Sequence, residues 1–590
     1  MNLGSYEIFE RKVVIRIKNR ICENAEDLLA SRLFKDMIKR AVGELQKRGS
    51  VLLKVFGKSE VEKEDIQLLI QTFQFLAKMP GEHVPNVVKG SHVFFQDTHL
   101  FNSFVEHLYN YWRTYDRFII CDSTGDDLDK RPYRTFNDTV ENLTQLIRSV
   151  YRDICENITN HSLRIYRQVK AGAEIATISI PVNVPFPPTG PYKQLNQVLM
   201  IRQILLNPPL ILNPPSNKRT GRFEIVHKNP MGLFDVQPEE WLCYPARVGS
   251  LVILIYFHKK YFELGFSLCN LFEVADDEAL KEKPDAIFAF GAPPKSLEDF
   301  GKFPTVIYDD EKNDLLIGAV PEDQEFGYFG YLKKMVLTLH NIKMMKKGRL
   351  PFHGALVKIM LKGRGEATIL MAGDTGAGKS ETLEALRVFG ENEIQDLIII
   401  ADDMGSLEIN DRGEIIGYGT ETGAFLRLDD LRPGYALGQI DRAIIMSPGK
   451  VNARIVLPVT TFENVIKGHR VHVILYANNY EEIDDEHLVI ESFASPEQAM
   501  AVFREGTVMS KGTTTSTGLV HSYYGNIFGP AQCKELHEPL AQRFFTKFFE
   551  NKLFVGQLRT RLGIAGMEVK GPEEAARELL KKLASVAENK

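Results

Sequence analysis

The sequence of 590 residues lacks several features that would place it in a specialised class of protein. Its six cysteines are scattered without a CxxC pair, which argues against a disulfide framework and a structural zinc site. The longest strongly apolar run, residues 251–257, is far too short to cross a bilayer. A formal net charge of -5 provides no basic field for nucleic acid or an anionic membrane. Charged residues begin at Glu7 and no apolar signal segment precedes them, so we expect a cytoplasmic protein without nucleic-acid or membrane partners.

A chain of this length is expected to fold as two or three domains. Residues 1–170 are predicted to be mostly helical, because apolar residues recur every three or four positions in three segments, 28–45, 66–79 and 140–158. Asn137 or Asp138 is the expected cap of the last helix. Alternating strand-like segments and proline-rich turns predict a mixed α/β domain over residues 171–345. A further α/β domain is expected over 346–570, followed by a helix over 571–590.

The most informative segment is 367–386, ATILMAGDTGAGKSETLEAL. It contains the P-loop pattern GxxxxGKS between an apolar strand-like run and an amphipathic helix-like run. Glycines let the backbone N–H groups turn toward phosphate oxygens, and the partial positive charge at the N-terminus of the helix attracts the same phosphate. Lys379 is expected to reach the β- and γ-phosphates, and Ser380 to bind Mg²⁺. The residues expected to bind the nucleotide are Gly373, Asp374, Thr375, Gly376, Ala377, Gly378, Lys379, Ser380 and Glu381.

A second acidic element, LIIIADD, follows at residues 397–403. A buried strand that ends in Asp402 and Asp403 would deliver two carboxylates to the phosphate end of a P-loop site. One carboxylate can hold the metal while the other accepts a proton from an attacking hydroxyl. A lone histidine such as His353, among apolar residues of a strand before the P-loop, is by itself more often structural than functional.

These motifs together resemble the HPr kinase/phosphorylase family. That family combines HG, a GxxGxGKSE loop and ADD, and the chain has His353–Gly354, GDTGAGKSE and ADD in the same order. Its nucleotide-binding core is shared with ATP-dependent phosphoenolpyruvate carboxykinase. Three further segments resemble carboxykinase motifs: ETGAFLR at 421–427 resembles EGGCYAK, NARIVLP at 452–458 resembles NTRxxYP, and residues 495–506 resemble TPEQAMYHFLSG. Thr220, Gly221 and Arg222 match the short carboxylate-binding element TGR.

The resemblance implies a carboxykinase-like P-loop catalytic domain with a mixed α/β lobe before it. It implies ATP and Mg²⁺ or Mn²⁺ as cofactors, with the metal held by Ser380, Asp403 and His353. It places Lys379, Arg454 and the aspartates Asp402 and Asp403 in catalysis. Arg222 and Arg427 become candidate substrate contacts, and Arg427 stands where the family has a lysine.

One segment departs from the carboxykinase pattern. The family has a GGEMKKG loop, in which a lysine binds Mn²⁺, whereas residues 319–330 here are AVPEDQEFGYFG and contain no lysine. The ungapped register also places Glu322 where the family has a tyrosine that contacts the substrate. An acidic loop without lysine is a poor site for a dicarboxylate such as oxaloacetate.

Three functional hypotheses follow. The first is a kinase that transfers phosphate from ATP to a hydroxyl of a small anionic metabolite or of a protein serine. The second is a carboxykinase that converts oxaloacetate and ATP to phosphoenolpyruvate, CO₂ and ADP. The third is a regulatory protein that senses nucleotide without turnover. The departing loop favours the kinase over the carboxykinase, and the complete P-loop with its two aspartates disfavours the sensor. The sequence leaves the oligomeric state, and the choice between ATP and GTP, open.

Overall fold

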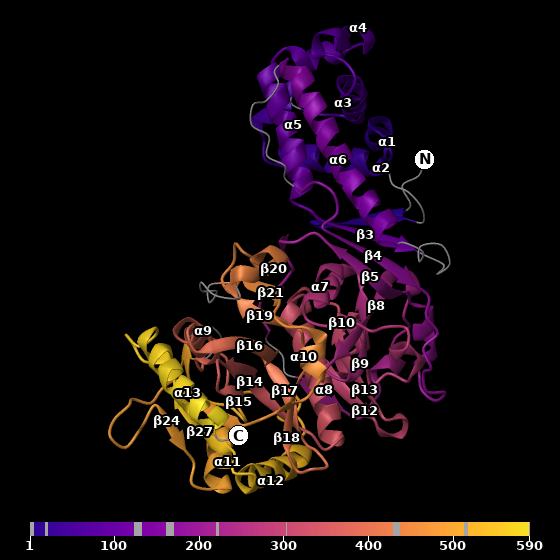
Figure 1. The fold of residues 1–590 in the computed structure, drawn as a ribbon. Coiled ribbons are helices and arrows are strands. Elements are labelled where there is room, and N and C mark those ends of the chain that lie inside the picture. The colour runs from indigo at the N-terminus through magenta and orange to yellow at the C-terminus, as the bar shows by residue number, and fades with distance from the viewer. Residues whose placement is uncertain are drawn as a thin grey trace. The chain divides into compact units, whose positions relative to one another are not determined.

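The computed structural model describes residues 5–17, 22–58, 60–122, 132–160, 170–219, 223–302, 304–428, 437–511 and 517–588. The chain divides into two compact units. The first unit contains residues 1–181 and 201–207, and the second contains 182–200 and 208–590. The segments 171–345 and 346–570, which we expected to be separate domains, both contribute to the second unit. Figure 1 shows the elements of each unit.

Helices make up most of the first unit, as the periodicity predicts. The helices are α1 (Ala25–Ala30), α2 (Arg32–Lys47), α3 (Lys63–Leu76), α4 (Val84–Val87), α5 (Thr98–Arg113) and α6 (Pro132–Thr159). Asn137 and Asp138 lie inside α6, so their prediction as its cap is wrong. Helices α5 and α6 pack along each other, and apolar residues from α1, α2, α3, α5 and α6 form one core (Figure 1). Buried positions on α2 such as Leu33, Met37 and Leu45 recur at helical spacing.

A sheet accompanies these helices, which the helix-based prediction of this region did not include. Its strands run in the order β1-β2-β3-β4-β5. They are β1 (Ser5–Phe9), β2 (Lys12–Ile17), β3 (Asp116–Asp122), β4 (Ile175–Ile180) and β5 (Met200–Leu206). β2, β3 and β4 are parallel neighbours and are largely buried. Continuous apolar runs of this kind are typical of strands covered on both faces.

The second unit begins with a mixed sheet in the order β8-β9-β11-β13-β12-β7, with β10 beside β8. Its strands are β7 (Phe223–Val226), β8 (Trp241–Val248), β9 (Leu251–His258), β10 (Glu273–Val274), β11 (Ala286–Ala292), β12 (Thr305–Asp310) and β13 (Leu315–Pro321). The strand content predicted for residues 171–345 is therefore confirmed. The central strands β9, β11 and β13 are parallel and almost wholly buried.

A second mixed sheet of this unit carries the P-loop, in the order β22-β18-β17-β14-β15-β23-β27-β24 with β16 on β14. Its strands are β14 (Leu350–Leu361), β15 (Gly365–Ala372), β16 (Ile394–Ala401), β17 (Met404–Ile409), β18 (Ile415–Gly419), β22 (His469–Arg470), β23 (Val473–Asn478), β24 (Ile490–Ser492) and β27 (Phe554–Arg559). Successive residues of β14 face opposite cores. Leu356 packs with Phe544 and Phe548, whereas Val357 packs with Leu579 and Leu583. The alternation is the two-residue period of a strand buried on both faces.

Two smaller sheets complete the second unit: one in the order β19-β21-β20-β6, and the hairpin of β25 and β26. Their strands are β6 (Leu210–Leu212), β19 (Gly423–Arg427), β20 (Ile444–Met446), β21 (Arg454–Pro458), β25 (Thr507–Lys511) and β26 (Thr517–His521). The helices of this unit are α7 (Phe262–Ser267), α8 (Phe329–Lys346), α9 (Lys379–Phe389), α10 (Phe462–Ile466), α11 (Pro496–Glu505), α12 (Lys534–Glu550) and α13 (Lys570–Glu588). α13 packs on α9 and β15 (Figure 1).

Helix α8 is buried along almost its whole length. It contacts β11 and β13 of one sheet and β14 and β17 of the other, so it lies between the two sheets. Its buried residues include Lys333, His340 and Lys343, beside apolar ones such as Leu337. Polar groups in such a place need partners within the protein. Among the described residues no helix is apolar enough over enough length to cross a bilayer.

Candidate active site

The P-loop lies where the sequence predicts it, between β15 and the N-terminus of α9. Gly373, Gly376 and Gly378 all have positive φ values, which residues with a side chain rarely adopt. Gly378 is the N-cap of α9, and a Cβ atom there would lie 2.5 Å from the hydroxyl oxygen of Thr560. Glycine is therefore required at this position both by the backbone conformation and by the close approach of Thr560.

Lys379 is buried and folds back over its own loop. Its Nζ donates to the carbonyl oxygens of Gly373 at 2.8 Å and Asp374 at 2.9 Å. Burial lowers the pKa of Lys379, and the negative charges of Asp403, Asp374 and Asp402 oppose this change. The P-loop lysine and the acidic pair are therefore close enough to act on each other's charge.

The other predicted nucleotide contacts surround the same turn. Asp374 and Gly376 are partly exposed, Thr375 is exposed and Ala377 is buried. Ser380 and Glu381 follow in the first turn of α9, where Ser380 is exposed and Glu381 is partly exposed. The amide of Asn479 donates to the Gly376 carbonyl at 2.9 Å and thereby fixes the loop to the end of β23. The backbone of α9 thus begins with accessible residues around Ser380, as an anion site at a helix N-terminus requires.

Asp402 and Asp403 form the connection between β16 and β17. β16 and β17 both pair with β14, and His353 of β14 stands opposite Met404 of β17. The backbone N–H of Gly354 donates to the Asp403 carbonyl at 2.9 Å, and the N–H of Gly373 donates to the His353 carbonyl at 3.0 Å. The histidine, the aspartates and the first P-loop glycine are thus joined by backbone hydrogen bonds.

The carboxylate of Asp403 is the centre of a buried ion cluster. Its Oδ1 lies 2.9 Å from Nε2 of His353. Its Oδ2 accepts hydrogen bonds from Lys333 at 2.8 Å and Lys334 at 2.9 Å. The Nδ1 of His353 donates to the carbonyl oxygen of Gly525, so Nε2 is the nitrogen that faces the cluster.

Sequence reasoning missed Lys333 and Lys334. The carboxykinase-based register ended at Gly330 and found no lysine, whereas α8 supplies two lysines within its first two turns. Residues 319–330 contain no lysine, and the two lysines that reach Asp403 come from three residues further along the chain. A signal was present: two adjacent lysines in a helix must find carboxylate partners if the helix is buried.

Glu421 is a further residue of the cluster that sequence reasoning did not select, and it is a carboxylate. Its side chain is 1% exposed, and its Oε1 lies 3.2 Å from Nζ of Lys333. Among the described residues neither of its carboxylate oxygens has a hydrogen-bond donor in good geometry. A buried carboxylate without hydrogen bonds is costly, and such groups concentrate at functional sites.

The acidic groups of this cluster have pKa values shifted in opposite directions. Burial would raise the pKa of Asp403, but Lys333 and Lys334 outweigh burial and hold it well below its ordinary value. Burial raises the pKa of Asp402, against the opposing charge of Lys333. Burial also raises the pKa of Glu421 to about 7. Asp403 therefore stays ionised, while Asp402 and Glu421 accept protons more readily.

Arg454 and Lys333 of this cluster both lie near the aromatic ring of Phe425. The Cζ of Arg454 is 5.3 Å from the ring centre of Phe425, and Nζ of Lys333 is 5.9 Å from the same ring centre. Arg427 stands opposite Arg454 in the pairing of β19 with β21. The Nε of Arg454 is buried and has no hydrogen-bond partner among the described residues. This region therefore holds a guanidinium with a donor that a bound anion can use.

Two predicted substrate residues are not part of the described cluster. Glu322 pairs with Lys260, and His258 lies 3.7 Å from it, so its charged neighbours come from the end of β9 and the turn that follows. Arg222 lies outside the residues that the structure describes, as do Thr220 and Gly221. The remaining predicted catalytic residues, Asp402, Asp403, Lys379 and Arg454, are drawn together by the contacts and charges given above.

The predicted metal set contains two strong ligand types, the carboxylate of Asp403 and the imidazole of His353, together with the Ser380 hydroxyl. In the described ranges no three His, Cys, Asp or Glu side chains gather as a metal site. Even so, the 2.9 Å approach of His353 to Asp403 brings an imidazole and an ionised carboxylate to one point. A carboxylate is a ligand type that Mg²⁺ and Mn²⁺ both prefer, so Asp403 is the strongest of the expected ligands.

Comparison with models of known protein families gives no match for this chain, and comparison with curated proteins gives none either. The family resemblance therefore depends on the sequence motifs alone.

Proposed function

We propose that the chain is an ATP- and metal-dependent phosphotransferase, most simply a kinase with a hydroxyl acceptor. One observation carries the proposal: the first P-loop glycine, Gly373, is hydrogen-bonded to the backbone of His353, and the imidazole of His353 lies 2.9 Å from Asp403, which also accepts from two lysines. Phosphoryl transfer depends mainly on positioning and on charge stabilisation, and this site supplies both a phosphate-binding turn and a concentration of fixed cations.

Asp402 and Asp403 would have different tasks. Both oxygens of Asp403 are engaged, one with His353 and the other with the two lysines. Among the described residues the carboxylate of Asp402 has no such hydrogen bonds, and its pKa is raised by burial. Asp402 is therefore the better acceptor for the proton of an attacking hydroxyl, while Asp403 remains a fixed anion.

The basic residues would stabilise the charge that moves during transfer. The acceptor oxygen bonds to the γ-phosphorus, the bond to the bridging oxygen of ADP breaks, and the hydroxyl proton passes to Asp402. Lys379 would leave its two loop carbonyls to bind the phosphates, and Arg454 would bind the transferring group with its free Nε–H. A divalent cation held by Asp403, His353 and Ser380 would neutralise phosphate charge when bound.

The acceptor is expected to be anionic or to approach through an anionic group. Lys333, Lys334 and Arg454 bring three cations around Asp403 and Phe425. Glu421 also pairs with Lys333, but burial raises its pKa to about 7, so near neutral pH it balances this charge only in part. A small hydroxylated metabolite with a carboxylate or phosphate fits this environment, and so does a serine beside acidic residues.

A carboxykinase is the second candidate, and a specific observation favours it. The absence of a lysine was the main objection to this activity, and Lys333 and Lys334 now lie at Asp403. In that reaction oxaloacetate loses CO₂, and the resulting enolate oxygen takes the γ-phosphoryl group of ATP. The same P-loop and the same cations would serve both reactions, so the acceptor distinguishes them.

The test is a turnover assay on the full chain with ATP and either Mg²⁺ or Mn²⁺. Parallel reactions contain oxaloacetate or a pool of hydroxylated anionic metabolites, and phosphorus NMR and mass spectrometry identify the products. Lys379→Met should abolish turnover, whereas Lys581→Met, at an exposed lysine of α13, should not. Phosphorylated hydroxyl compounds establish the kinase, and phosphoenolpyruvate establishes the carboxykinase. Nucleotide binding without ADP formation from any pool would contradict both and leave a nucleotide sensor.

A further inference from the structure

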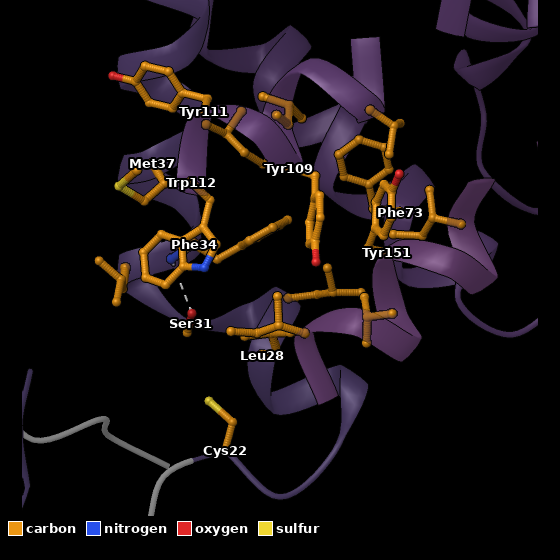
Figure 2. Close-up of a pocket in the computed structure, with 18 of the residues that line it drawn as sticks. Cys22, Leu28, Ser31, Phe34, Met37, Phe73, Tyr109, Tyr111, Trp112 and Tyr151 are labelled. Atoms are coloured by element: carbon orange, nitrogen blue, oxygen red, sulfur yellow. Dashed lines mark hydrogen bonds between the residues drawn. The ribbon is translucent and has the colours of Figure 1, made fainter. Parts of the chain in front are cut away.

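The first unit contains a cavity that plays no part in the proposed function. Its volume is about 130 Å³, and it is lined by residues of β2, α1, α2, α3, α5 and α6. Figure 2 shows aromatic side chains from four of these helices around it. They are Phe34, Phe73, Tyr109, Tyr111, Trp112 and Tyr151. The cavity is partly open to the outside, and its walls are almost entirely apolar.

The polar atoms of the lining aromatic residues are already engaged elsewhere. The indole N–H of Trp112 donates to the carbonyl of Ala171 at 2.6 Å. The hydroxyl of Tyr111 donates to Glu44 at 2.8 Å, and the hydroxyl of Tyr151 donates to Glu106. The hydroxyl of Tyr109 interacts with Arg148. A bound molecule would therefore meet aromatic rings and aliphatic side chains such as Leu28 and Ile147 rather than hydrogen-bonding groups.

The remaining polar groups of the wall are few and weak. Ser31 accepts a hydrogen bond from the backbone N–H of Phe34 at 3.2 Å, as the N-cap of α2. The thiol of Cys22 lines the cavity, and burial raises its pKa, so it is neutral at ordinary pH. Water needs two or more polar partners to occupy a site, and a charged ligand needs a counter-charge. Among the lining residues that the structure describes, the cavity offers neither, so an uncharged apolar molecule is the occupant that these walls suit.

We propose that this cavity is a binding site for a small, uncharged aromatic molecule of about one ring. Dry apolar cavities of about 150 Å³ bind benzene, which is close to the volume found here. Aromatic walls favour an aromatic guest, because edge-to-face and offset-stacked contacts add to the energy of burial. This inference stands independently of the phosphotransferase proposal, since every residue that carries it belongs to the first unit.

The chain contains a reporter for the test. It has two tryptophans, Trp112 in the cavity wall and Trp241 in the second unit. In full-length Trp241→Phe protein, Trp112 fluorescence is titrated with toluene, and in parallel with benzoate, benzylammonium and cyclohexane. We expect a saturable change with toluene, at least about tenfold weaker binding of cyclohexane, and no saturable change with either ion. A matched response to toluene and benzoate, or no saturable response to toluene, would overturn the proposal.

Two valines of the same core provide a matched pair of variants. Val150 lines the cavity and Val42 does not, although both are buried in one hydrophobic core. Val150→Leu should weaken toluene binding about tenfold by occupying part of the volume, and Val150→Phe should remove it. Val42→Leu should leave toluene affinity unchanged. If Val150→Phe does not fold, Val150→Leu and Val42→Leu still test the proposal. Equal toluene affinity in these two variants would contradict binding in this cavity.

Discussion

Two buried ion clusters, one in each unit, differ in how completely their charges are satisfied. In the first unit, Arg117 of β3 meets Glu174 just before β4. The Nε and the backbone N–H of Arg117 both donate to one carboxylate oxygen, at 3.2 and 3.1 Å, and its Nη2 pairs with the other. The ring of Trp112 covers the guanidinium at 5.5 Å. Burial lowers the pKa of Arg117 only to about 10, so the pair stays charged.

The cluster in the second unit is open by comparison. Lys333 is shared between Asp403 and Glu421, Asp403 contacts nitrogen atoms of Lys333, Lys334 and His353, and Glu421 has no well-formed hydrogen bond among the described residues. A closed pair fixes two strands in register and has no donor or acceptor left for a ligand. An open cluster keeps unused capacity at a cost in stability, which is the usual condition of a functional site.

The largest expected effect is on the rate of phosphoryl transfer, which should depend on the cluster of the second unit and not on that of the first. Asp403→Asn should lower phosphoryl transfer by roughly 10³-fold, because it removes the fixed anion that positions the cations and the metal. Glu174→Gln should leave the rate per folded molecule unchanged. The measurement is ADP formation under saturating ATP, normalised to the folded fraction from fluorescence. A comparable loss in Glu174→Gln would show that the closed pair serves catalysis as well, and the contrast between the clusters would fail.

For stability we expect the opposite order. Replacing an acid by its amide should cost more unfolding free energy in the closed pair of the first unit than in the open cluster of the second. Glu174→Gln leaves Arg117 buried with an incomplete partner and should cost about 3 kcal/mol of unfolding free energy. Glu421→Gln removes a charge without hydrogen bonds and should change stability by no more than about 1 kcal/mol, or increase it. Urea unfolding measures each change with one tryptophan per unit, Trp112 in Trp241→Phe protein and Trp241 in Trp112→Phe protein. Equal losses in both variants would contradict the distinction.

A neutral buried residue of α8 should control the acid stability of the second unit. Burial lowers the pKa of His340 from 6.5 to about 4, and its Nδ1 lies 2.9 Å from the Asn341 side-chain oxygen. Between these pH values the unfolded chain binds a proton that the folded chain does not, so stability falls as pH falls from 6.5 toward 4. The full loss is about 3 kcal/mol.

The variant His340→Gln should remove most of this pH dependence while retaining a polar side chain beside Asn341. Urea unfolding of Trp112→Phe protein at pH 7 and at pH 5 measures the difference. The control is His487→Gln, at an exposed histidine bonded to Asp484, which should leave the pH dependence unchanged. An unchanged slope in His340→Gln would assign the acid sensitivity to other groups.

The site residues that sequence analysis predicted belong to short local motifs, whereas the site residues that it missed do not. Gly373, Gly378 and Lys379 stand at fixed spacing within one turn, so the sequence predicts their arrangement directly. Asp402 and Asp403 end an apolar strand, and that context predicts where they point. Lys333 and Glu421 lie far apart in sequence and become neighbours only because α8 is buried between two sheets. No local period encodes that proximity, and an ungapped comparison stopped three residues before the lysines.

The same distinction applies to the fold. The 3.6-residue period of apolar residues predicts the helices of the first unit. Strands β2 and β3 are short, largely apolar runs within this helix-rich region, β1 is a short mixed segment, and none of the three was predicted. Asn137 or Asp138 was expected to cap α6, yet the helix begins at Pro132. Proline is favoured in the first turn of a helix and Asn is not confined to caps, so capping residues alone placed this boundary too late along the chain.

The smallest expected effect concerns a hydrogen bond in the wall of the apolar cavity, where no charge is involved. Ser31 is the N-cap of α2 and accepts from the Phe34 N–H at 3.2 Å. Ser31→Ala should cost about 1 kcal/mol, because it leaves a helix N–H without its acceptor. Ser103→Ala is the matched control, since the Ser103 hydroxyl donates to the His99 carbonyl within α5 and its removal should change stability by less than about 0.5 kcal/mol. Urea unfolding followed through Trp112 compares them. A loss in Ser31→Ala as large as that in Glu174→Gln would mean that capping, and not the closed ion pair, dominates the stability of this unit.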